Sequence, residues 1–428
     1  MKIVIEQSHY SLVNMGDLSM LQVAVSRLKN LWPDASIKVF AYKQAEDLLE
    51  KYCPKTDPVI PSGQDVWLTT PLSDRLTKLM SNSSEQLKDL EWQIRYQFPS
   101  MGRWLVQRRL KKRKQLSHYE KLNLFLNAIE EADLVVAAGG GYITDAFENK
   151  ATKSLTILGL ATKLGKPTVM LGHGLGPLDN PKLRTKAKAI LPKVNLISLR
   201  EKRAGIPLLK SLGVSPQRIM TTGDDAIELV YDNRSLELGN AIGVNLRIAR
   251  YSDVNADLLE TVRTVLQQAA ASKGAPLLPV PIEFYDLNSD VRTIKEILAG
   301  YDDTSDAGDS LRTPVQVIKQ AGRCRVVVTG SYHAGVFALA QGIPVVGLAK
   351  SEYYKDKFLG LADIFGKGCE VVFLDDTCLK EKLMAGIDKA WQSAEELRPY
   401  LLESASQQAE LGRSAYQKVY KLVESYRS

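Results

Sequence analysis

The chain alternates short β-branched, apolar runs with stretches of helical periodicity, and this alternation limits the folds that it can adopt. The runs predicted to form strands are residues 3–6, 37–41, 134–138, 168–172, 196–199, 219–222, 242–246, 277–280, 326–329, 345–348 and 370–374. Helical patterns lie between most of them, which is the order of βαβ units. The sequence therefore predicts parallel sheets covered by helices on both faces.

A polar stretch divides this alternation into two halves. Residues 231–240 (YDNRSLELGN) have the composition of a linker, and a length of 428 residues is enough for two cores. We expect an α/β protein with two doubly wound, Rossmann-like domains, residues 1–235 and 236–378, that face each other across a cleft. Residues 379–428 are helical in pattern, and we expect these helices to pack back against the first domain.

A basic, mostly helical insertion interrupts the first domain at about residues 70–125. Its segment 103–114 (RWLVQRRLKKRK) combines a run of lysines and arginines with a tryptophan and aliphatic residues. A basic amphipathic helix with an aromatic anchor can lie on an anionic membrane surface. The alternative is a solvated helix face, which is the usual meaning of a charge run.

Composition argues against several classes of protein. The formal net charge of +7 is modest for this length, so we expect anionic ligands but no nucleic-acid partner. The four cysteines form no CxxC pair, which favours a reducing compartment. No signal peptide and no membrane-spanning apolar run is recognised. We expect a cytoplasmic protein, either free or peripheral at the inner membrane face through residues 103–114; the oligomeric state is not predicted.

A histidine turn in the second half is the most informative candidate for chemistry. In open parallel sheets, ligands bind at the carboxyl ends of strands, where helix N-termini offer free amide hydrogens. His333 lies at such a strand-to-helix turn, together with Ser331 and Tyr332. An imidazole titrates near neutral pH, so His333 could protonate an anionic substrate held there.

Two glycine-containing turns in the first half supply candidate cleft-lining residues. Asn14 and Asp17 precede the first predicted helix, and Asp17 either caps that helix or points into the cleft. The triplet Gly139, Gly140 and Gly141 ends a strand, and residues without side chains let a ligand or a neighbouring backbone come close. The triplet lacks the spacing of a dinucleotide fingerprint.

Later strand ends add polar residues to the same predicted cleft. His173 lies between two glycines, either as a binding or proton-shuttling group or as a histidine bonded within its loop. Arg200 could hold a carboxylate or a phosphate, or pair with a neighbouring acid such as Asp224. Asp224 and Asp225 are adjacent and would point in different directions, so we expect hydrogen bonding and no metal site.

Taken in order, these motifs resemble the polysaccharide pyruvyl transferase family. They are NxGD, a GGG turn, GxGxGP, an SxR strand end, GDD, GVNLR, and a histidine turn followed by GIPVV and a Tyr/Lys segment. The resemblance covers about residues 14–358. It implies a GT-B-like transferase that moves a pyruvyl group from phosphoenolpyruvate to a sugar hydroxyl of a cell-surface polysaccharide or its lipid-linked precursor. It implies phosphoenolpyruvate as co-substrate, with no metal and no other cofactor.

The resemblance also implies roles for particular residues. His333 matches the catalytic histidine of the family. The residues expected around the anionic donor are Arg200, Ser331, Tyr332, Lys355 and Lys357.

One departure from the family pattern leaves the donor open. The family usually has Arg-x-His at the histidine turn, whereas this chain has Ser331 in place of that arginine. The missing positive charge could come from Arg325, Lys350 or one of the two nearby lysines. The alternatives are a GT-B glycosyltransferase with a nucleotide-sugar donor, or a noncatalytic relative that binds an anionic glycan or a membrane surface through residues 103–114.

Overall fold

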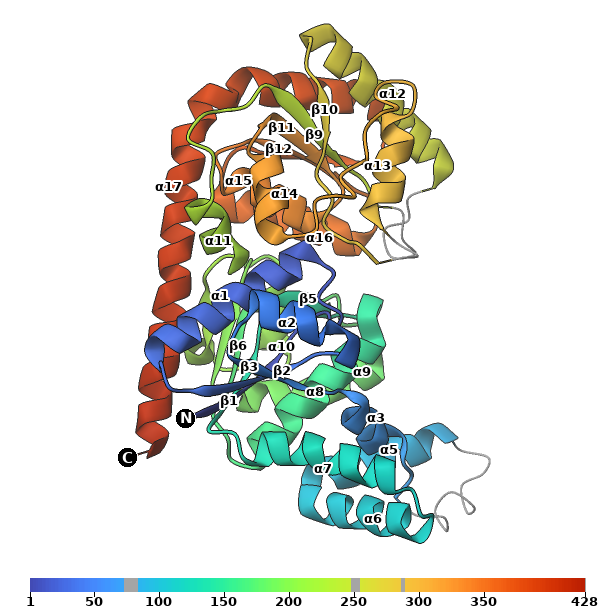
Figure 1. Ribbon diagram of the computed structural model, residues 1–428, viewed down its shortest axis with the longest axis vertical. Coiled ribbons are helices and arrows are strands. Elements are labelled where there is room, and N and C mark those ends of the chain that lie inside the picture. The colour runs from blue at the N-terminus through green and yellow to red at the C-terminus, as the bar shows by residue number, and fades with distance from the viewer. Residues whose placement is uncertain (73–83, 248–254, 286–288, 428) are drawn as a thin grey trace.

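Two parallel sheets, each covered by helices, form the two halves of the molecule. We describe a computed structural model of the chain, in residues 1–72, 84–247, 255–285 and 289–427. One half lies above the other in Figure 1, and the last helix runs along both. The fold confirms the predicted α/β architecture of two Rossmann-like domains.

The two sheets differ in size and strand order. The first has the order β3-β2-β1-β4-β6-β7-β8, with β5 paired to β6. Its strands are β1 (Lys2–Glu6), β2 (Ser36–Phe40), β3 (Thr56–Val59), β4 (Leu134–Ala137), β5 (Gly140–Ile143), β6 (Thr168–Leu175), β7 (Leu196–Leu199) and β8 (Ile219–Thr221). The second has the order β10-β9-β11-β12-β13. Its strands are β9 (Ala241–Asn245), β10 (Leu277–Pro279), β11 (Cys324–Thr329), β12 (Val345–Ala349) and β13 (Cys369–Phe373).

Helices cover both faces of each sheet. In the first half they are α1 (Met15–Leu31), α2 (Glu46–Tyr52), α3 (Ser62–Thr69), α5 (Ser84–Gln97), α6 (Pro99–Lys112), α7 (Leu116–Glu130), α8 (Glu148–Lys163), α9 (Pro181–Ile190), α10 (Gly205–Ser211) and α11 (Ala226–Asp232). In the second half they are α12 (Ala256–Lys273), α13 (Asp290–Leu298), α14 (Pro314–Ala321), α15 (Tyr332–Leu339) and α16 (Glu352–Phe365). Helices α5 to α7 project from the lower end of the molecule (Figure 1). They fall within the residues in which the helical, basic insertion was expected.

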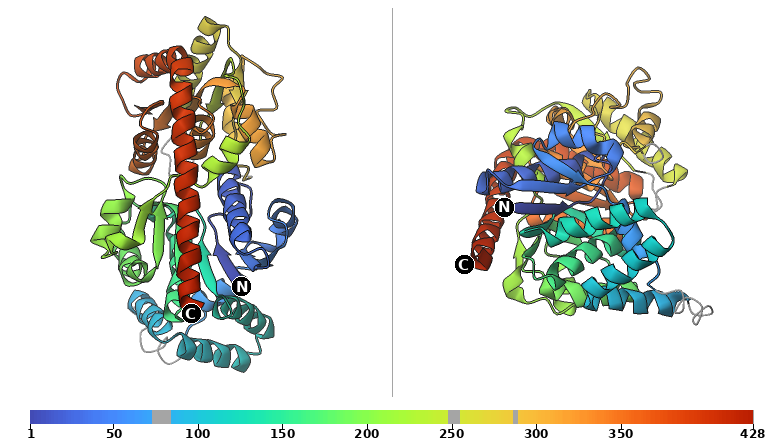
Figure 2. Two further views of the ribbon diagram at one scale, coloured as in Figure 1. Left: turned by 90° about the vertical axis from the view of Figure 1, so that its left-hand side faces the viewer. Right: turned by 60° about the horizontal axis from the view of Figure 1, so that its bottom comes forward.

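A single helix, α17 (Leu379–Arg427), replaces the several C-terminal helices that we expected. Near its start, Leu383 and Ile387 are part of the apolar core of the second half. Near its end, Tyr416 and Val419 are part of the core of the first half. The helix therefore spans both halves from end to end (Figure 2) and joins them through burial of apolar surface.

A short backbone pairing between residues 13–15 and 282–284 also connects the two halves. The N–H of Met15 donates to the carbonyl of Ile282 at 2.8 Å, and the N–H of Phe284 donates to the carbonyl of Val13 at 3.1 Å. The start of α1 is thereby held against the loop between β10 and α13. This pairing fixes the position of the NxGD motif relative to the second half.

Candidate active site

A cavity of about 450 Å³ lies between the two halves. Most of the residues that line it follow the carboxyl ends of strands, as expected for parallel sheets. The lining from the first half includes Asn14, Asp17, Gly141, Lys150 and Arg200. The lining from the second half includes Arg247, Glu283, Ser331, Tyr332, His333, Tyr353 and Lys357.

The histidine turn places His333 at the wall of this cavity. Strand β11 ends at Thr329, whose hydroxyl oxygen accepts the N–H of Ser331 at 2.8 Å, and α15 begins at Tyr332. The imidazole is 10% exposed, and its Nε2 lies 3.7 Å from Oδ2 of Asp224 in the opposite half. This turn therefore connects the two halves through the polar contact between His333 and Asp224 as well as through packing.

Asp224 connects the histidine to Arg200. Its Oδ2 lies 3.4 Å from Nη1 of Arg200, and its Oδ1 accepts the N–H of Ala226 at 2.9 Å. Burial acts to raise the pKa of Asp224, but His333, Arg200 and the Ala226 amide outweigh it and lower the pKa. Asp224 lies behind the wall and not among the lining residues, so it orients the two groups as a buried carboxylate.

The guanidinium of Arg200 is held in place by an aromatic ring and by glycines. It is 2% exposed and lies over the ring of Tyr332 at 3.9 Å. A Cβ at Gly141 would come within 2.7 Å of its Nη2, and one at Gly174 within 2.7 Å of its Nε. The GGG and GxGxGP motifs thus supply the space that this arginine occupies.

The two candidate lysines of α16 point in different directions. Lys357 lines the cavity and lies over the ring of Tyr353 at 3.9 Å. Burial and then the nearby Arg200 lower the pKa of its ammonium group. Lys355 instead contacts Glu352 at 3.1 Å and Asp375 at 3.2 Å, outside the cavity lining. Two residues along a helix are about 200° apart around its axis, so only one of the pair can face the cavity.

The charge lost with the family arginine is not restored by Arg325. That side chain contacts Glu395 and the carbonyl of Trp391 on α17, and Lys350 is absent from the described lining. Arg247, from the GVNLR motif, does line the cavity, where its Nε and Nη2 bind Asp290 at 2.8 and 2.9 Å. Sequence reasoning quoted that motif without singling out its arginine.

Other predicted residues turn out to be structural. His173 is fully buried, and its Nε2 lies 3.0 Å from the carbonyl of Ala137. Burial lowers its pKa to about 4, so it is a neutral core residue and not a cleft residue. Gly139 and Gly140 lie outside the described lining, and a Cβ at Gly139 would meet the sulfur of Met20 at 2.6 Å. These two glycines allow neighbouring side chains to pack closely against the backbone.

Asn14 and Asp17 of the NxGD motif have different roles at the start of α1. Asn14, not Asp17, caps α1, because its side-chain oxygen accepts the N–H groups of Gly16 and Asp17. Asp17 lines the cavity. The side-chain nitrogen of Asn14 also donates to Glu283 at 2.7 Å. Glu283 escaped sequence reasoning because no recognisable motif surrounds it.

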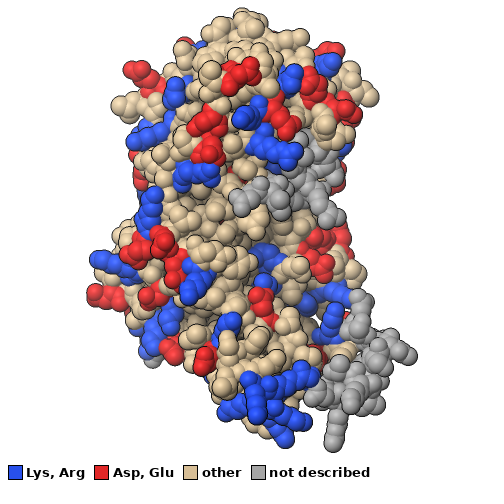
Figure 3. Space-filling model, turned by 45° about the vertical axis from the view of Figure 1, so that its right-hand side comes forward, with Lys and Arg blue, Asp and Glu red and all other residues tan. Residues whose placement is uncertain are grey.

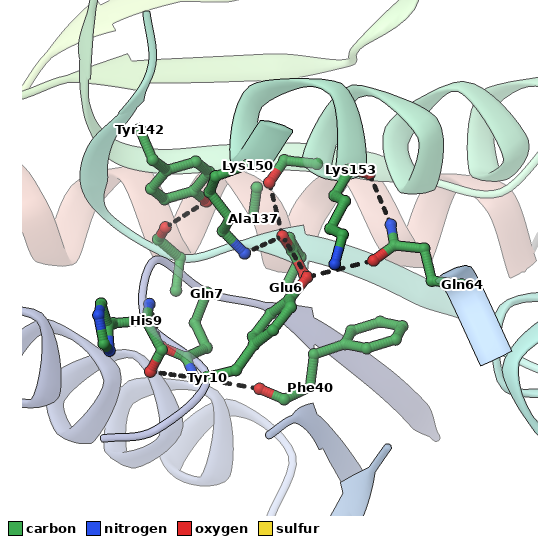
Figure 4. A network of polar contacts seen from close by, with 12 residues as sticks. Glu6, Gln7, His9, Tyr10, Phe40, Gln64, Ala137, Tyr142, Lys150 and Lys153 are labelled. Atoms are coloured by element: carbon green, nitrogen blue, oxygen red, sulfur yellow. Dashed lines mark hydrogen bonds and ion pairs between the residues drawn. The ribbon is translucent and has the colours of Figure 1, made fainter. Parts of the chain in front are cut away.

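A buried carboxylate supports the wall of the cavity in the first half (Figure 4). Glu6 is fully buried and accepts hydrogen bonds from Lys150 at 2.6 Å, Ser154 at 2.6 Å and Tyr10 at 2.9 Å. Burial lowers the pKa of Lys150, although Glu6 opposes that shift. Lys150 lines the cavity, so it presents an ammonium group already paired with a carboxylate. Sequence reasoning missed this network, because Glu6 was interpreted only as the last residue of a predicted strand.

The described residues include neither a metal-binding cluster nor a membrane-spanning helix. No group of three or more His, Cys, Asp and Glu side chains there is arranged to hold a metal ion. None of the described helices is both long and apolar enough to cross a membrane.

Solved structures define the class of protein to which this arrangement belongs. The chain superposes on MnaA of S. aureus, solved with UDP, with a TM-score of 0.53 at 14% identity, over 100% of this chain and 96% of that one. It superposes on a glycosyltransferase from Rickettsia africae with a TM-score of 0.51 at 13% identity, over 99% and 98% of the two chains. The fold is therefore that of the GT-B class.

Sequence comparison identifies the family within that class. The model of the polysaccharide pyruvyl transferase family matches residues 14–352. The chain belongs to the polysaccharide pyruvyl transferase family and is a transferase. The amylovoran biosynthesis protein AmsJ of Erwinia amylovora is 26% identical over 113 residues, 26% of this chain and 26% of that protein. The match thus spans about a quarter of that relative's length.

Proposed function

We propose that the protein transfers a pyruvyl group from phosphoenolpyruvate to two hydroxyls of a glycan, forming a ketal. The observation that carries this proposal is the cavity between the halves, where His333 faces two cationic side chains, Arg200 and Lys357. Phosphoenolpyruvate has a carboxylate and a phosphate, and buried guanidinium and ammonium groups bind such anions strongly. Family membership supports the same chemistry.

The proposed reaction balances without a further cofactor. His333 donates a proton to the terminal vinyl carbon, which becomes a methyl group. One acceptor hydroxyl adds to the central carbon, the C–O bond to phosphate breaks, and the second hydroxyl completes the ketal. Of the two hydroxyl protons, one replaces the proton used by His333 and the other leaves with phosphate. In this scheme the guanidinium of Arg200 pairs with the carboxylate of phosphoenolpyruvate.

Lys357 is proposed as the phosphate contact that offsets the serine at position 331. Burial and the nearby Arg200 lower the pKa of its ammonium group. A bound phosphate would favour the charged ammonium and reverse part of that shift. In this proposal Tyr332 holds the guanidinium of Arg200 in line with the donor, and Ser331 leaves room for the phosphate.

Phosphate release from phosphoenolpyruvate tests the proposed function. The purified protein is incubated with phosphoenolpyruvate and a panel of free and lipid-linked oligosaccharides, and we expect acceptor-dependent phosphate together with a product that gains a pyruvyl ketal. Thermal-shift titrations with phosphoenolpyruvate, UDP and GDP are run beside the assay. Stabilisation by a nucleoside diphosphate alone, with sugar transfer and no ketal, would replace this donor by a nucleotide sugar.

We propose further that the enzyme works in the cytoplasm on acceptors at the inner membrane face. The exposed side of α6 supports this idea, since Met101 and Trp104 are 44% and 55% exposed there. Arg108, Lys111 and Lys112 continue the same side of the helix and are exposed. Lysines and arginines gather at this lower end of the molecule (Figure 3). Such a surface fits an anionic bilayer.

Vesicle binding checks the membrane surface. Each basic residue near an anionic bilayer contributes about 1 kcal/mol, so reversing Lys111 and Lys112 to glutamate is expected to weaken binding to vesicles with anionic lipid about thirtyfold or more. Reversal of the exposed Lys418 and Lys421 on α17 is the matched control and should change little. Equal binding of both double variants, or no binding of the wild type, would contradict a role for α6.

A further inference from the structure

We propose that Glu283 is the general base that removes the proton from the acceptor hydroxyl. This inference rests on the proposed function and adds to it the group that activates the glycan. In the step, the O–H bond of the hydroxyl breaks, its oxygen bonds to the central carbon of the pyruvyl group, and the proton passes to Oε1 of Glu283. The proton then leaves with phosphate, which restores the carboxylate.

Of the two carboxylate oxygens of Glu283, only one accepts a hydrogen bond from a described residue. Its Oε2 accepts the side-chain N–H of Asn14 at 2.7 Å and lies 3.8 Å from Nη1 of Arg247. Its Oε1 is buried and accepts no hydrogen bond from any described residue. Glu283 is 7% exposed and lines the cavity. A buried acceptor without a donor is costly, and a substrate hydroxyl would satisfy it.

Glu283 and His333 share one support. Asn14 binds Glu283 with its side-chain nitrogen, and with its side-chain oxygen it accepts the N–H of Gly16 at 3.1 Å. The Cα of Gly16 in turn packs directly against the ring of His333. The acid and the base both belong to the second half and contact the same helix start of the first half, so a donor and an acceptor between them would meet both groups.

The surroundings of Glu283 favour a basic carboxylate. The charged and titratable groups that face it are Arg247 at the end of β9, His9 after β1 and Asp290 on α13, and Asn14 is its neutral partner. Burial is the largest influence and raises the pKa of Glu283, although Arg247 and His9 oppose it. A carboxylate with a raised pKa is a stronger base.

Two neighbouring carboxylates are less suited to this role. Both oxygens of Asp290 are used, by Arg247, by the side chain of Asn245 and by the backbone N–H groups of residues 282 and 283. Asp224 has a lowered pKa and lies behind the wall. Asp17 does line the cavity, so it is the rival that the experiment has to separate.

The variant Glu283→Gln tests the proposal because its amide oxygen can still accept from Asn14 while the basic group is lost. We expect the rate of ketal formation at saturating substrates to fall about a hundredfold, with the apparent affinity for phosphoenolpyruvate within about twofold of the wild type. In the wild type the rate should rise with pH through the raised pKa of Glu283, because the carboxylate must be ionised to act. That acidic limb should disappear in the variant.

Asp17→Asn is the matched comparison. It should retain the acidic limb of the profile; loss of the limb in this variant, and its persistence in Glu283→Gln, would assign the base to Asp17 and overturn the proposal. A Glu283→Gln enzyme with the wild-type rate would overturn it as well. If the wild type forms no ketal from phosphoenolpyruvate with any acceptor, the proposed function fails first, which is a different result.

Discussion

Glutamine in place of His333 is expected to reduce ketal formation about a thousandfold while the protein still folds and binds phosphoenolpyruvate. Positioned proton transfer contributes roughly 10² to 10⁴ in rate, and the vinyl carbon has to be protonated before the acceptor can add. Glutamine has a similar reach but cannot donate a proton at neutral pH. The side chain is 10% exposed and lines the cavity, so a polar replacement of similar length is tolerated there.

Phosphate release at saturating phosphoenolpyruvate measures this loss, and a thermal-shift titration measures donor binding. The control is His118→Gln, a change at an exposed histidine on α7, which should keep the wild-type rate. A His333→Gln protein with more than about a tenth of the wild-type rate would exclude general acid catalysis by this side chain. Loss of donor binding would instead indicate that the imidazole mainly binds the anion.

The strand predictions succeed where β-branched runs are buried, and they fail where the sheet itself imposes the strand. Strands β3 and β5 escaped prediction because Thr56–Val59 contains Asp and Pro and Gly140–Ile143 begins with two glycines. In each segment two residues that disfavour strands offset two that favour them. Strand β3 is at the edge of the sheet, where proline is tolerated, and β5 forms only by pairing with β6.

The site was predictable to the extent that its residues follow strand ends. The position of His333 and Arg200 at the cavity follows from parallel topology alone. The choice between Lys355 and Lys357 requires the phase of α16, which the sequence leaves open. Arg247 follows the end of β9 and belongs to a quoted motif, so it could have been singled out. Glu283 lies beside the start of α1 because the halves pair through backbone bonds at residues 13–15, and no local pattern encodes such a tertiary contact.

Alanine in place of Gly16 is expected to disable the enzyme without adding or removing any polar group. A Cβ at this position would lie 2.0 Å from Cγ of His333, whereas carbon atoms in ordinary contact are about 3.5 to 4.0 Å apart. The ring, or the start of α1, must therefore move by more than about 1 Å, and a displacement of this size can cost about a hundredfold in rate. We expect a loss of at least that magnitude, approaching the loss of His333→Gln.

The stability of the same variant separates displacement from unfolding. Gly16 has ordinary helical backbone geometry within α1, where alanine is favoured over glycine by about 1 kcal/mol, and this gain offsets part of the steric cost. Gly386→Ala on α17 is the control, because its Cβ would meet no atom closer than 3.5 Å. We expect both variants to unfold cooperatively near the wild-type temperature, and only Gly16→Ala to lose ketal formation. If Gly16→Ala keeps full activity, the imidazole does not act from the position seen here. That outcome would also remove the shared support on which the pairing of His333 with Glu283 depends.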